Sequence, residues 1–213
     1  MLLDALLEHE LSLGTEIQSR LPSRVIHMPL VFDDEMSRKA IHRYASTIQP
    51  TAPYLPSNVD FLQQLNGFDS RDQVGQSLFQ PRFLVLGLGD VYQGSPCAVP
   101  LDPRHRLFGT NNPSRPCTPR GAVGIAGQYF CIYATDTPGG YQLVGHTVPI
   151  WSEFPKAQPG EEAPNPWFFS LLEQITFHPV AEEDLAAAEA KGTHDSLSES
   201  RTPSWICTNM SNG

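Results

Sequence analysis

Short segments with the composition of β-strands dominate the chain after Pro81. Four of them are rich in Val, Ile, Tyr and Phe and are interrupted by glycine and proline: RFLVLGLGDVY, VGIAGQYFCIYAT, YQLVGHTVPIW and ITFHPV. This pattern is typical of antiparallel barrels and sandwiches, in which short strands are joined by tight turns. The sequence Pro138-Gly139-Gly140 is predicted to form one such turn. We therefore expect the second part of the chain to be mainly β.

The first eighty residues show helical patterns instead. Apolar residues recur at helical spacing, and acidic residues precede basic ones in the second pattern, as the helix dipole favours. Ser70 and Gln73 have the spacing of a capping box, and Gly67 is placed to end the preceding helix. The predicted helices cover residues 2–14, 33–48, 57–67 and 70–78, and a closing helix is predicted at 181–192.

Helices followed by strands indicate an α+β, mainly β fold, because a parallel sheet would need alternating strands and helices. We expect a helical N-terminal part at residues 1–80 and a β-barrel core at 81–192. The segment 154–166 is predicted to be an exposed loop. Residues 193–213 are polar and aperiodic, which predicts a mobile tail.

Composition excludes several classes of protein. Hydrophobic residues make up 40% of the chain, which is enough for a core, and the net charge of -9 argues against nucleic-acid or anionic-membrane partners. The four cysteines lack C-x-x-C spacing, so we expect free thiols and no zinc site. The start of the chain is too acidic for a signal peptide, and no run of about 18 apolar residues predicts a membrane span. We expect a cytoplasmic protein.

The stretch LDPRHR concentrates charge within apolar, glycine-rich surroundings. On an extended segment Arg104 and Arg106 would point the same way, with His105 opposite. Two guanidinium groups on one face could hold a carboxylate, and an imidazole could move protons near neutral pH. The alternative is a surface loop in which Asp102 pairs with an arginine.

Two further stretches carry candidate residues. The proline-rich loop TNNPSRPCTPR adds Arg115 and amide side chains such as Asn112, and TPGGYQLVGHT adds Tyr141, Gln142 and His146. An ordinary connection and a structural histidine are the alternatives. GLGDVYQG lacks the third glycine and the following helix of a dinucleotide-binding loop, so glycines at a barrel bend are the better interpretation. We predict neither a metal site nor a serine or cysteine nucleophile.

Several segments, in this order, resemble the carboxyltransferase region of urea carboxylase. They are LPSNVDFLQQLNG, FLVLGLGDVYQGSP, AVPLDPRHRLFGT, NPSRPCTPRGAVGIAGQYFCIYATDTPGGYQLVGHTVPIW and PWFFSLLEQITFHPV. More narrowly, they resemble the half of that region related to allophanate hydrolase subunit 1, to the kinase inhibitor KipI and to a 5-oxoprolinase subunit. The resemblance covers about residues 22–185. It implies a cyclophilin-like β-barrel with a helical insertion, to which residues 22–32 add a strand.

The resemblance implies a carboxyl transfer from carboxybiotin, beside a homologous partner half, to a small planar substrate. No covalently bound cofactor is expected; biotin would be supplied in trans as carboxybiotin. Several departures from the family's pattern are visible. About twenty residues precede LPSRVIHMP, so we expect most of the family's N-terminal lobe to be missing. The family's G-R-T becomes Gly145-His146-Thr147, and its basic and aromatic residues before the NP loop become Thr110 and Asn111.

We therefore expect a stand-alone, divergent carboxyltransferase half that binds a small polar or carboxylated metabolite. It would be an enzyme, either through carboxyl transfer with partner subunits or through repurposed cyclisation, isomerisation or elimination. A non-catalytic, KipI-like regulator that binds a partner protein is the alternative. The candidate catalytic residues are His105, His146 and Tyr141, and the candidate substrate-binding residues are Arg104, Arg106, Arg115, Gln142, Asp102 and Asn112.

Overall fold

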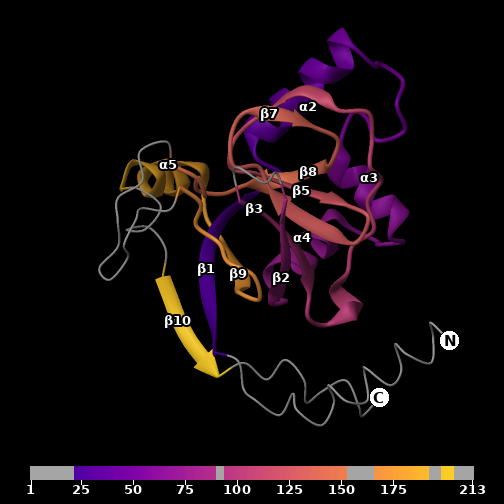
Figure 1. The fold of residues 1–213 in the computed structure, drawn as a ribbon. Helices are drawn as coiled ribbons and strands as arrows, with labels where there is room; N and C mark the ends of the chain where they lie inside the picture. The colour runs from indigo at the N-terminus through magenta and orange to yellow at the C-terminus, as the bar shows by residue number, and fades with distance from the viewer. Residues whose placement is uncertain (1–21, 90–93, 153–165, 192–197, 204–213) are drawn as a thin grey trace, which may run out of the picture.

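The computed structural model describes residues 22–89, 94–152, 166–191 and 198–203 as a mixed α/β structure that is mainly β (Figure 1). Its helices are α2 (Glu35–Thr47), α3 (Asn58–Leu65), α4 (Arg71–Phe79), α5 (Glu182–Lys191) and the short 3-10 helix η1 (Pro103–His105). Its strands are β1 (Pro22–Phe32), β2 (Phe83–Gly89), β3 (Ser95–Pro100), β4 (Arg115–Thr118), β5 (Ala122–Ala126), β6 (Tyr129–Ile132), β7 (Thr137–Gly139), β8 (Gln142–His146), β9 (Gln174–Pro179) and β10 (Ser198–Pro203).

Seven strands form a closed barrel. The sheet order is β10-β1-β8-β5-β6-β3-β2-β9, and an additional β1–β9 pairing closes the ring. β1 pairs in parallel with β9 over residues 25–30 and antiparallel with β8 at its end, so this one strand joins both sides of the opening. β10 pairs antiparallel with residues 22–27 of β1. β4 and β7 form a separate two-stranded ribbon.

Aromatic rings fill the barrel interior. The ring centroids of Phe83 and Phe130 lie 4.6 Å apart, and both rings contact Phe177 edge to face at 5.9 and 5.5 Å. These arrangements suit the aromatic quadrupole, and the three side chains are almost completely buried. Apolar residues alternate inward along the strands, so the predicted strand periodicity places them in one continuous core.

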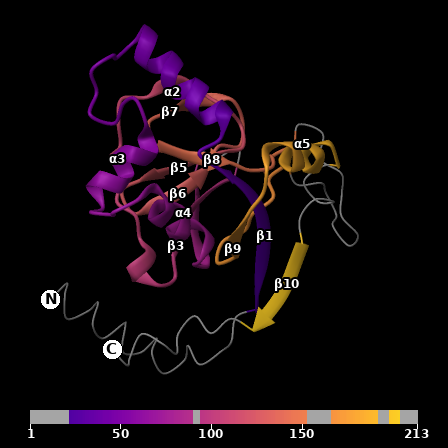
Figure 2. The same ribbon diagram turned by 180° about the vertical axis from the view of Figure 1, so that it is seen from behind.

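The helices α2, α3 and α4 form an insertion between β1 and β2. α2 and α3 lie on the opposite side of the molecule from α5, as both ribbon views show (Figures 1 and 2). Asp34 and Ser57 cap the first two helices through side-chain oxygens, and Ser70 with Gln73 forms the predicted capping box of α4. Asn58 ties the insertion to the barrel, because its amide donates to the Tyr54 carbonyl and accepts the Leu143 N–H.

The predicted fold class is confirmed, and the predicted helices correspond to α2, α3, α4 and α5. Gly67 adopts the positive φ of +68° that its helix-ending role requires. The turn predicted at Pro138-Gly139-Gly140 is wrong in its placement, because residues 137–139 form β7. Proline lacks a backbone N–H, but it is tolerated in β7 because this strand pairs with β4 alone. The other edge of β7 needs no hydrogen-bond donor.

Three other expectations fall wholly or partly outside the described residues. The helix predicted at residues 2–14 lies outside them, as does nearly all of the loop predicted at 154–166. In the region predicted to be a mobile tail, residues 198–203 instead form β10, whose backbone pairs antiparallel with β1. A polar sequence can form such an edge strand because backbone hydrogen bonds need no apolar side chains.

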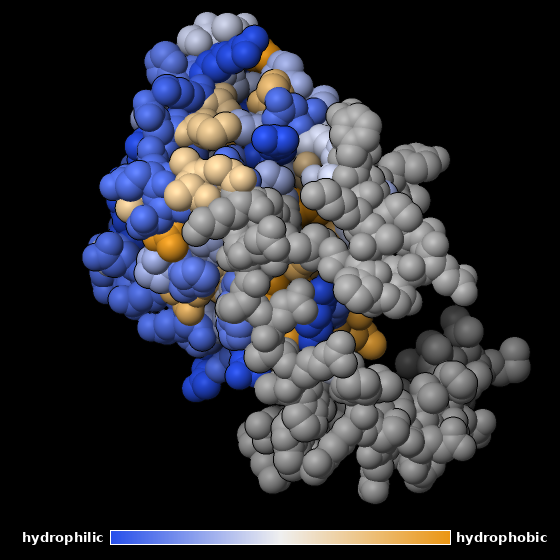
Figure 3. Space-filling model, turned by 90° about the vertical axis from the view of Figure 1, so that its left-hand side faces the viewer, coloured by the Kyte–Doolittle hydropathy of each residue, from blue (hydrophilic) through white to orange (hydrophobic). Residues whose placement is uncertain are grey.

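The part of the surface that is coloured in Figure 3 is mostly hydrophilic. In Figure 3, separate hydrophobic areas interrupt a surface that is otherwise hydrophilic. Within the described residues, no helix has the length and apolar character required to cross a membrane.

Candidate functional site

The acid and first arginine of LDPRHR form a local pair at the surface. Pro103–His105 form η1, and the Asp102 carboxylate caps it by accepting the Arg104 N–H at 2.9 Å. The same carboxylate accepts from Arg104 Nε at 3.0 Å and Nη2 at 2.6 Å, while the Arg104 side chain is 85% exposed. These hydrogen bonds lower the pKa of Asp102 to about 2. The segment is therefore not extended, because a proline and a capping carboxylate turn the chain into a short helix.

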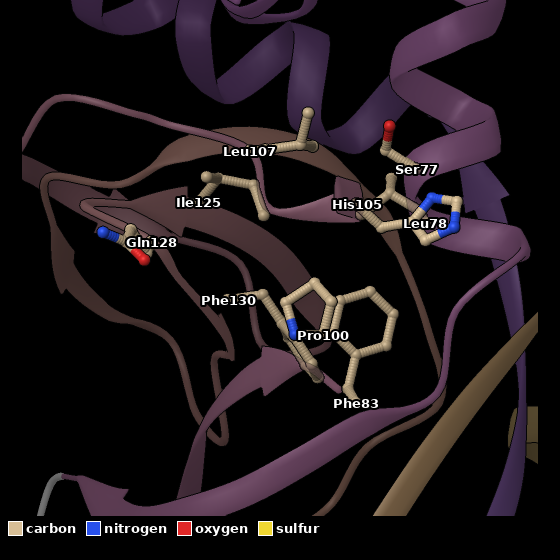
Figure 4. A pocket seen from close by; sticks show the side chains of 9 residues that line it. All are labelled: Ser77, Leu78, Phe83, Pro100, His105, Leu107, Ile125, Gln128 and Phe130. Atoms are coloured by element: carbon tan, nitrogen blue, oxygen red, sulfur yellow. The ribbon is translucent and has the colours of Figure 1, made fainter. Parts of the chain in front are cut away.

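His105 lines the mouth of a small pocket that reaches the barrel core (Figure 4). Its cavity volume is about 10 Å³, which is about enough for one water molecule and far below the usual range for ligand cavities. In Figure 4 the imidazole lies beside Ser77 and Leu78, with Gln128 at the far side. The lining residues are Ser77, Leu78, Phe83, Pro100, His105, Leu107, Ile125, Gln128 and Phe130.

Arg106 is held at this pocket by Gln128. Its Nη1 donates to the Gln128 amide oxygen at 3.3 Å, and its Nε is buried and has no hydrogen-bond partner in the described part of the chain. Sequence reasoning missed both Gln128 and Ser77, because neither belongs to a charged motif and only the fold brings them to His105.

Arg115 has a different environment from the other two arginines. It begins β4, opposite Gly139 of β7, and is only 3% exposed. Nε and Nη2 are buried without a hydrogen-bond partner among the described residues. Burial lowers the pKa of Arg115, and the groups that counteract this effect are Tyr133, Cys131, Tyr44 and Tyr54, with no carboxylate among them.

Two tyrosines of the helical insertion complete this environment. The hydroxyls of Tyr44 in α2 and Tyr54 lie 3.1 Å apart, and their rings stack at 6.3 Å. Burial, and then the hydrogen bond with Tyr44, raises the pKa of Tyr54 to about 12. Tyr44 lies on the same buried face of α2 as Ser37 and Ile41. Helical spacing could therefore have predicted its burial, but not its proximity to Arg115.

Gln142 and Asn112 also carry polar atoms without partners. Gln142 is fully buried, and both its Oε1 and its Nε2 lack a hydrogen bond within the described residues. The backbone of Gly109 lies so close that a Cβ there would be 2.9 Å from Gln142 Oε1. Asn112 donates its backbone N–H to the Gly140 carbonyl at 3.0 Å, while its Nδ2 is buried without a partner in the described structure.

Tyr141 lies beside Tyr133 on the outer side of the barrel. Their rings meet edge to face at 6.4 Å, and the Tyr133 hydroxyl accepts the Tyr141 N–H at 3.4 Å. Burial raises the pKa of Tyr141 to about 12, so this phenol stays protonated at neutral pH and can donate a hydrogen bond.

His146 lies under the C-terminal helix. It ends β8, is 5% exposed, and places Nε2 at 3.3 Å from Glu189 Oε1 of α5. Its Nδ1 is buried without a partner among the described residues. Gly121 has a φ of +78° and lies against the ring, at a distance where a Cβ would be 2.8 Å from Nε2. Sequence reasoning missed Glu189, because only the docking of α5 brings it to the imidazole.

The candidate residues therefore do not form one cluster, and the arginines and histidines other than the exposed Arg104 lie in three separate environments. His105 and Arg106 adjoin the pocket, Arg115 lies among tyrosines beneath the helical insertion, and His146 pairs with Glu189 of α5. Within the described ranges, no group of three or more His, Cys, Asp or Glu side chains is placed to hold a metal ion. The architecture defines a closed seven-stranded barrel with a helical insertion and buried, unpaired polar groups beneath it.

Comparison with known proteins identifies the family. Residues 2–160 match the family model described as carboxyltransferase domain, subdomain C and D. The chain is 49% identical over 185 residues to urea amidolyase of Saccharomyces cerevisiae and 47% identical to that of Lachancea kluyveri, in each case over 86% of this chain. The chain belongs to the carboxyltransferase family, in the region of subdomains C and D.

Solved structures agree with this assignment. The crystal structure of Kluyveromyces lactis urea carboxylase matches 93% of this chain and 18% of that chain, with 40% identity and a TM-score of 0.74. A conserved uncharacterized protein of Pyrococcus horikoshii has the same fold, with 23% identity, a TM-score of 0.52 and coverage of 76% of this chain and 61% of that chain. The chain spans about a tenth of the length of the two curated relatives.

Proposed function

We propose that this chain is a divergent carboxyltransferase unit that binds a small polar or carboxylated metabolite and acts with partner subunits. Membership of the family supports this proposal, as does the name urea amidolyase carried by relatives that are nearly half identical. Biotin would be supplied in trans, as carboxybiotin on another subunit, and the homologous carboxyltransferase half is the proposed partner. The cytoplasm is the proposed compartment.

The buried and unpaired guanidinium of Arg115 carries the proposal. A guanidinium offers parallel donors that match a carboxylate, and such bonds are stronger where water is excluded. Buried donors without a partner are costly, so an external anion would satisfy what the described chain leaves unsatisfied. A carboxyl group is the chemistry that these donors fit best. Arg104 is a weaker candidate, because Asp102 already occupies its donors.

The two histidines are the proposed acid–base groups. Glu189 is within hydrogen-bond reach of His146 and could orient its ring, which is the arrangement of a general base with its supporting carboxylate. His105 is less buried and lies at the pocket mouth. Tyr141 and Gln142 would supply neutral hydrogen bonds. If the chemistry is repurposed, the same groups would support cyclisation, isomerisation or elimination.

The test combines binding with turnover. Thermal-shift titrations of the whole chain with acetate, bicarbonate, urea and biotin should raise the melting temperature saturably for at least one ligand, because binding to the native state stabilises it. Arg115→Lys should weaken that binding about tenfold, since the loss of one charge-assisted hydrogen bond is worth about 1.5 kcal/mol. Arg43→Met, which removes an exposed arginine of α2, is the matched control.

Carboxyl transfer is measured with carboxybiotin and urea, with and without the homologous partner half. Product should appear only with the partner, and His146→Ala and His105→Ala should separate the two acid–base candidates. Absence of any stabilising ligand, together with absence of product in the presence of the partner, would overturn the proposal. Recovery of one stoichiometric partner protein by a chain that turns nothing over would instead support a KipI-like regulator.

A further inference from the structure

Cys97 and Cys131 lie opposite each other on neighbouring strands. β3 and β6 are antiparallel, with Ala98 opposite Phe130, so the next position along the ladder places Cys97 opposite Cys131. Ala98 and Phe130 point into the core, where they are 0% and 1% exposed. Because side chains alternate across a strand, both thiols point outward on the same face.

The pKa of Cys131 is consistent with a nearby Cys97 thiol. After burial, the interaction with Cys97 is the next largest factor that raises the pKa of Cys131. Both thiols also act on Tyr141, which lies on the same outer face. Both cysteines are free and partly exposed. Directly opposed residues on antiparallel strands have Cα atoms about 4.5–5.5 Å apart, which lies inside the range that a disulfide spans.

The pair lies where β3 and β6 are neighbours in the barrel. Among the described strands, β3 and β6 share one registered pair, whereas β2 and β3 share six. The chain between the two cysteines contains η1, the loop that follows it and β4 with Arg115. A disulfide between Cys97 and Cys131 would therefore link β3 to β6. It would also close a covalent loop around the segment that carries most of the candidate site residues.

We propose that Cys97 and Cys131 form an oxidative modification site, at which a low-molecular-weight disulfide such as oxidised glutathione converts the two thiols into one intramolecular disulfide. One thiolate attacks the reagent and releases one reduced thiol, and a mixed disulfide forms. The second protein thiolate then attacks the mixed disulfide at the protein sulfur and releases the second reduced thiol. The two protein sulfurs are oxidised, the reagent is reduced, and the two protons go to the released thiolates.

Burial of the two thiols slows their oxidation. It raises the pKa of both thiols, so a small fraction is ionised at neutral pH, and the rate should increase as the pH rises toward the thiol range. Cys117 is exposed and is the competing thiol within the described part of the chain. It lies on β4, outside the β3–β6 ladder, so it is removed in the test.

The test uses the whole chain carrying Cys117→Ser and Cys207→Ser, which leaves the two proposed partners as its only cysteines. Incubation with oxidised glutathione at pH 8.5 should bring the free-thiol count from two to zero, with a mass loss of two hydrogens and no retained glutathione. The disulfide should raise the melting temperature by about 10 °C, because it closes a long loop in the unfolded chain. Reduction should restore the original value.

A second probe reports proximity without oxidation. Dibromobimane, which becomes fluorescent when it bridges two nearby thiols, should label this variant and should not fluoresce when Cys97→Ser is added. If the variant does not fold, peptide mapping of the oxidised wild-type chain should instead identify a disulfide-linked peptide that contains Cys97 and Cys131. Two stable mixed disulfides with glutathione, or two thiols that remain free while dibromobimane gives no fluorescence, would overturn the proposal.

Discussion

Replacing Arg115 with methionine tests whether its guanidinium serves a ligand or the fold. Nε and Nη2 are buried without partners in the described structure, and each such donor costs about 1–3 kcal/mol. Methionine retains most of the apolar stem and removes both donors. Replacing a buried ion pair with well-packed apolar groups is often neutral or stabilising by about 1–4 kcal/mol, and removing unpaired buried donors should act in the same direction. We therefore expect Arg115→Met to leave the free energy of unfolding unchanged or raise it within that range, while carboxylate binding is lost.

Arg24 provides the matched control. Its guanidinium is hydrogen-bonded to Glu173 at 2.8 and 3.0 Å and to the Phe168 carbonyl at 2.7 Å. Arg24→Met leaves the nearly buried Glu173 carboxylate without this partner and should cost about 2–3 kcal/mol, after allowance for the partial exposure of the pair. Urea denaturation followed by far-UV circular dichroism measures both variants. A loss as large for Arg115→Met as for Arg24→Met would refute the reasoning, because Arg115 would then stabilise the fold.

Two further substitutions test how the insertion and β8 are held. Asn58→Ala should lower the free energy of unfolding by about 2–5 kcal/mol, since it leaves the buried Leu143 N–H and Tyr54 carbonyl unpaired; a loss below about 1 kcal/mol in urea denaturation would contradict this. Gly121→Ala should lower the melting temperature by several degrees, because its φ is +78° and the new Cβ would meet the Thr147 carbonyl and His146. Alanine at Gly67, which also has a positive φ but open space around it, is the comparison that separates steric contact from backbone strain.

Features set by neighbours in the sequence could be predicted. The capping box of Ser70 and Gln73 depends on residues three apart, and the end of α3 depends on the conformational freedom of Gly67. Strand composition similarly indicated the β-rich second part, because Val, Ile and aromatic residues pack well on a pleated surface. The resemblance to urea carboxylase supplied the closed barrel and its insertion, which local patterns alone do not specify.

Features set by distant contacts could not be predicted. Tyr44 and Tyr54, which act on the pKa of Arg115, lie more than sixty positions earlier in the sequence, and α2 with Tyr44 packs against β4 only in the folded chain. The pairing of His146 with Glu189 depends on where α5 docks. LDPRHR was grouped as one charged cluster, but η1 turns Arg104 toward Asp102 and leaves His105 at the pocket. Sequence proximity therefore overstated how closely these charges act together.

The position of β1 constrains how this molecule can be divided. β1 precedes the helical insertion, yet it is the strand that joins β8 to β9. A polypeptide that began at residue 81 would lack β1 and would expose the unpaired backbone of β8 and β9. Exposed strand edges promote aggregation, because they can pair with the edges of other chains. During synthesis, β1 can pair with β9 only after β9 has emerged. The closed barrel therefore requires the helical insertion to stay in the same polypeptide, between β1 and β2. A gene fusion or split that preserves the barrel must keep residues 22–179 together.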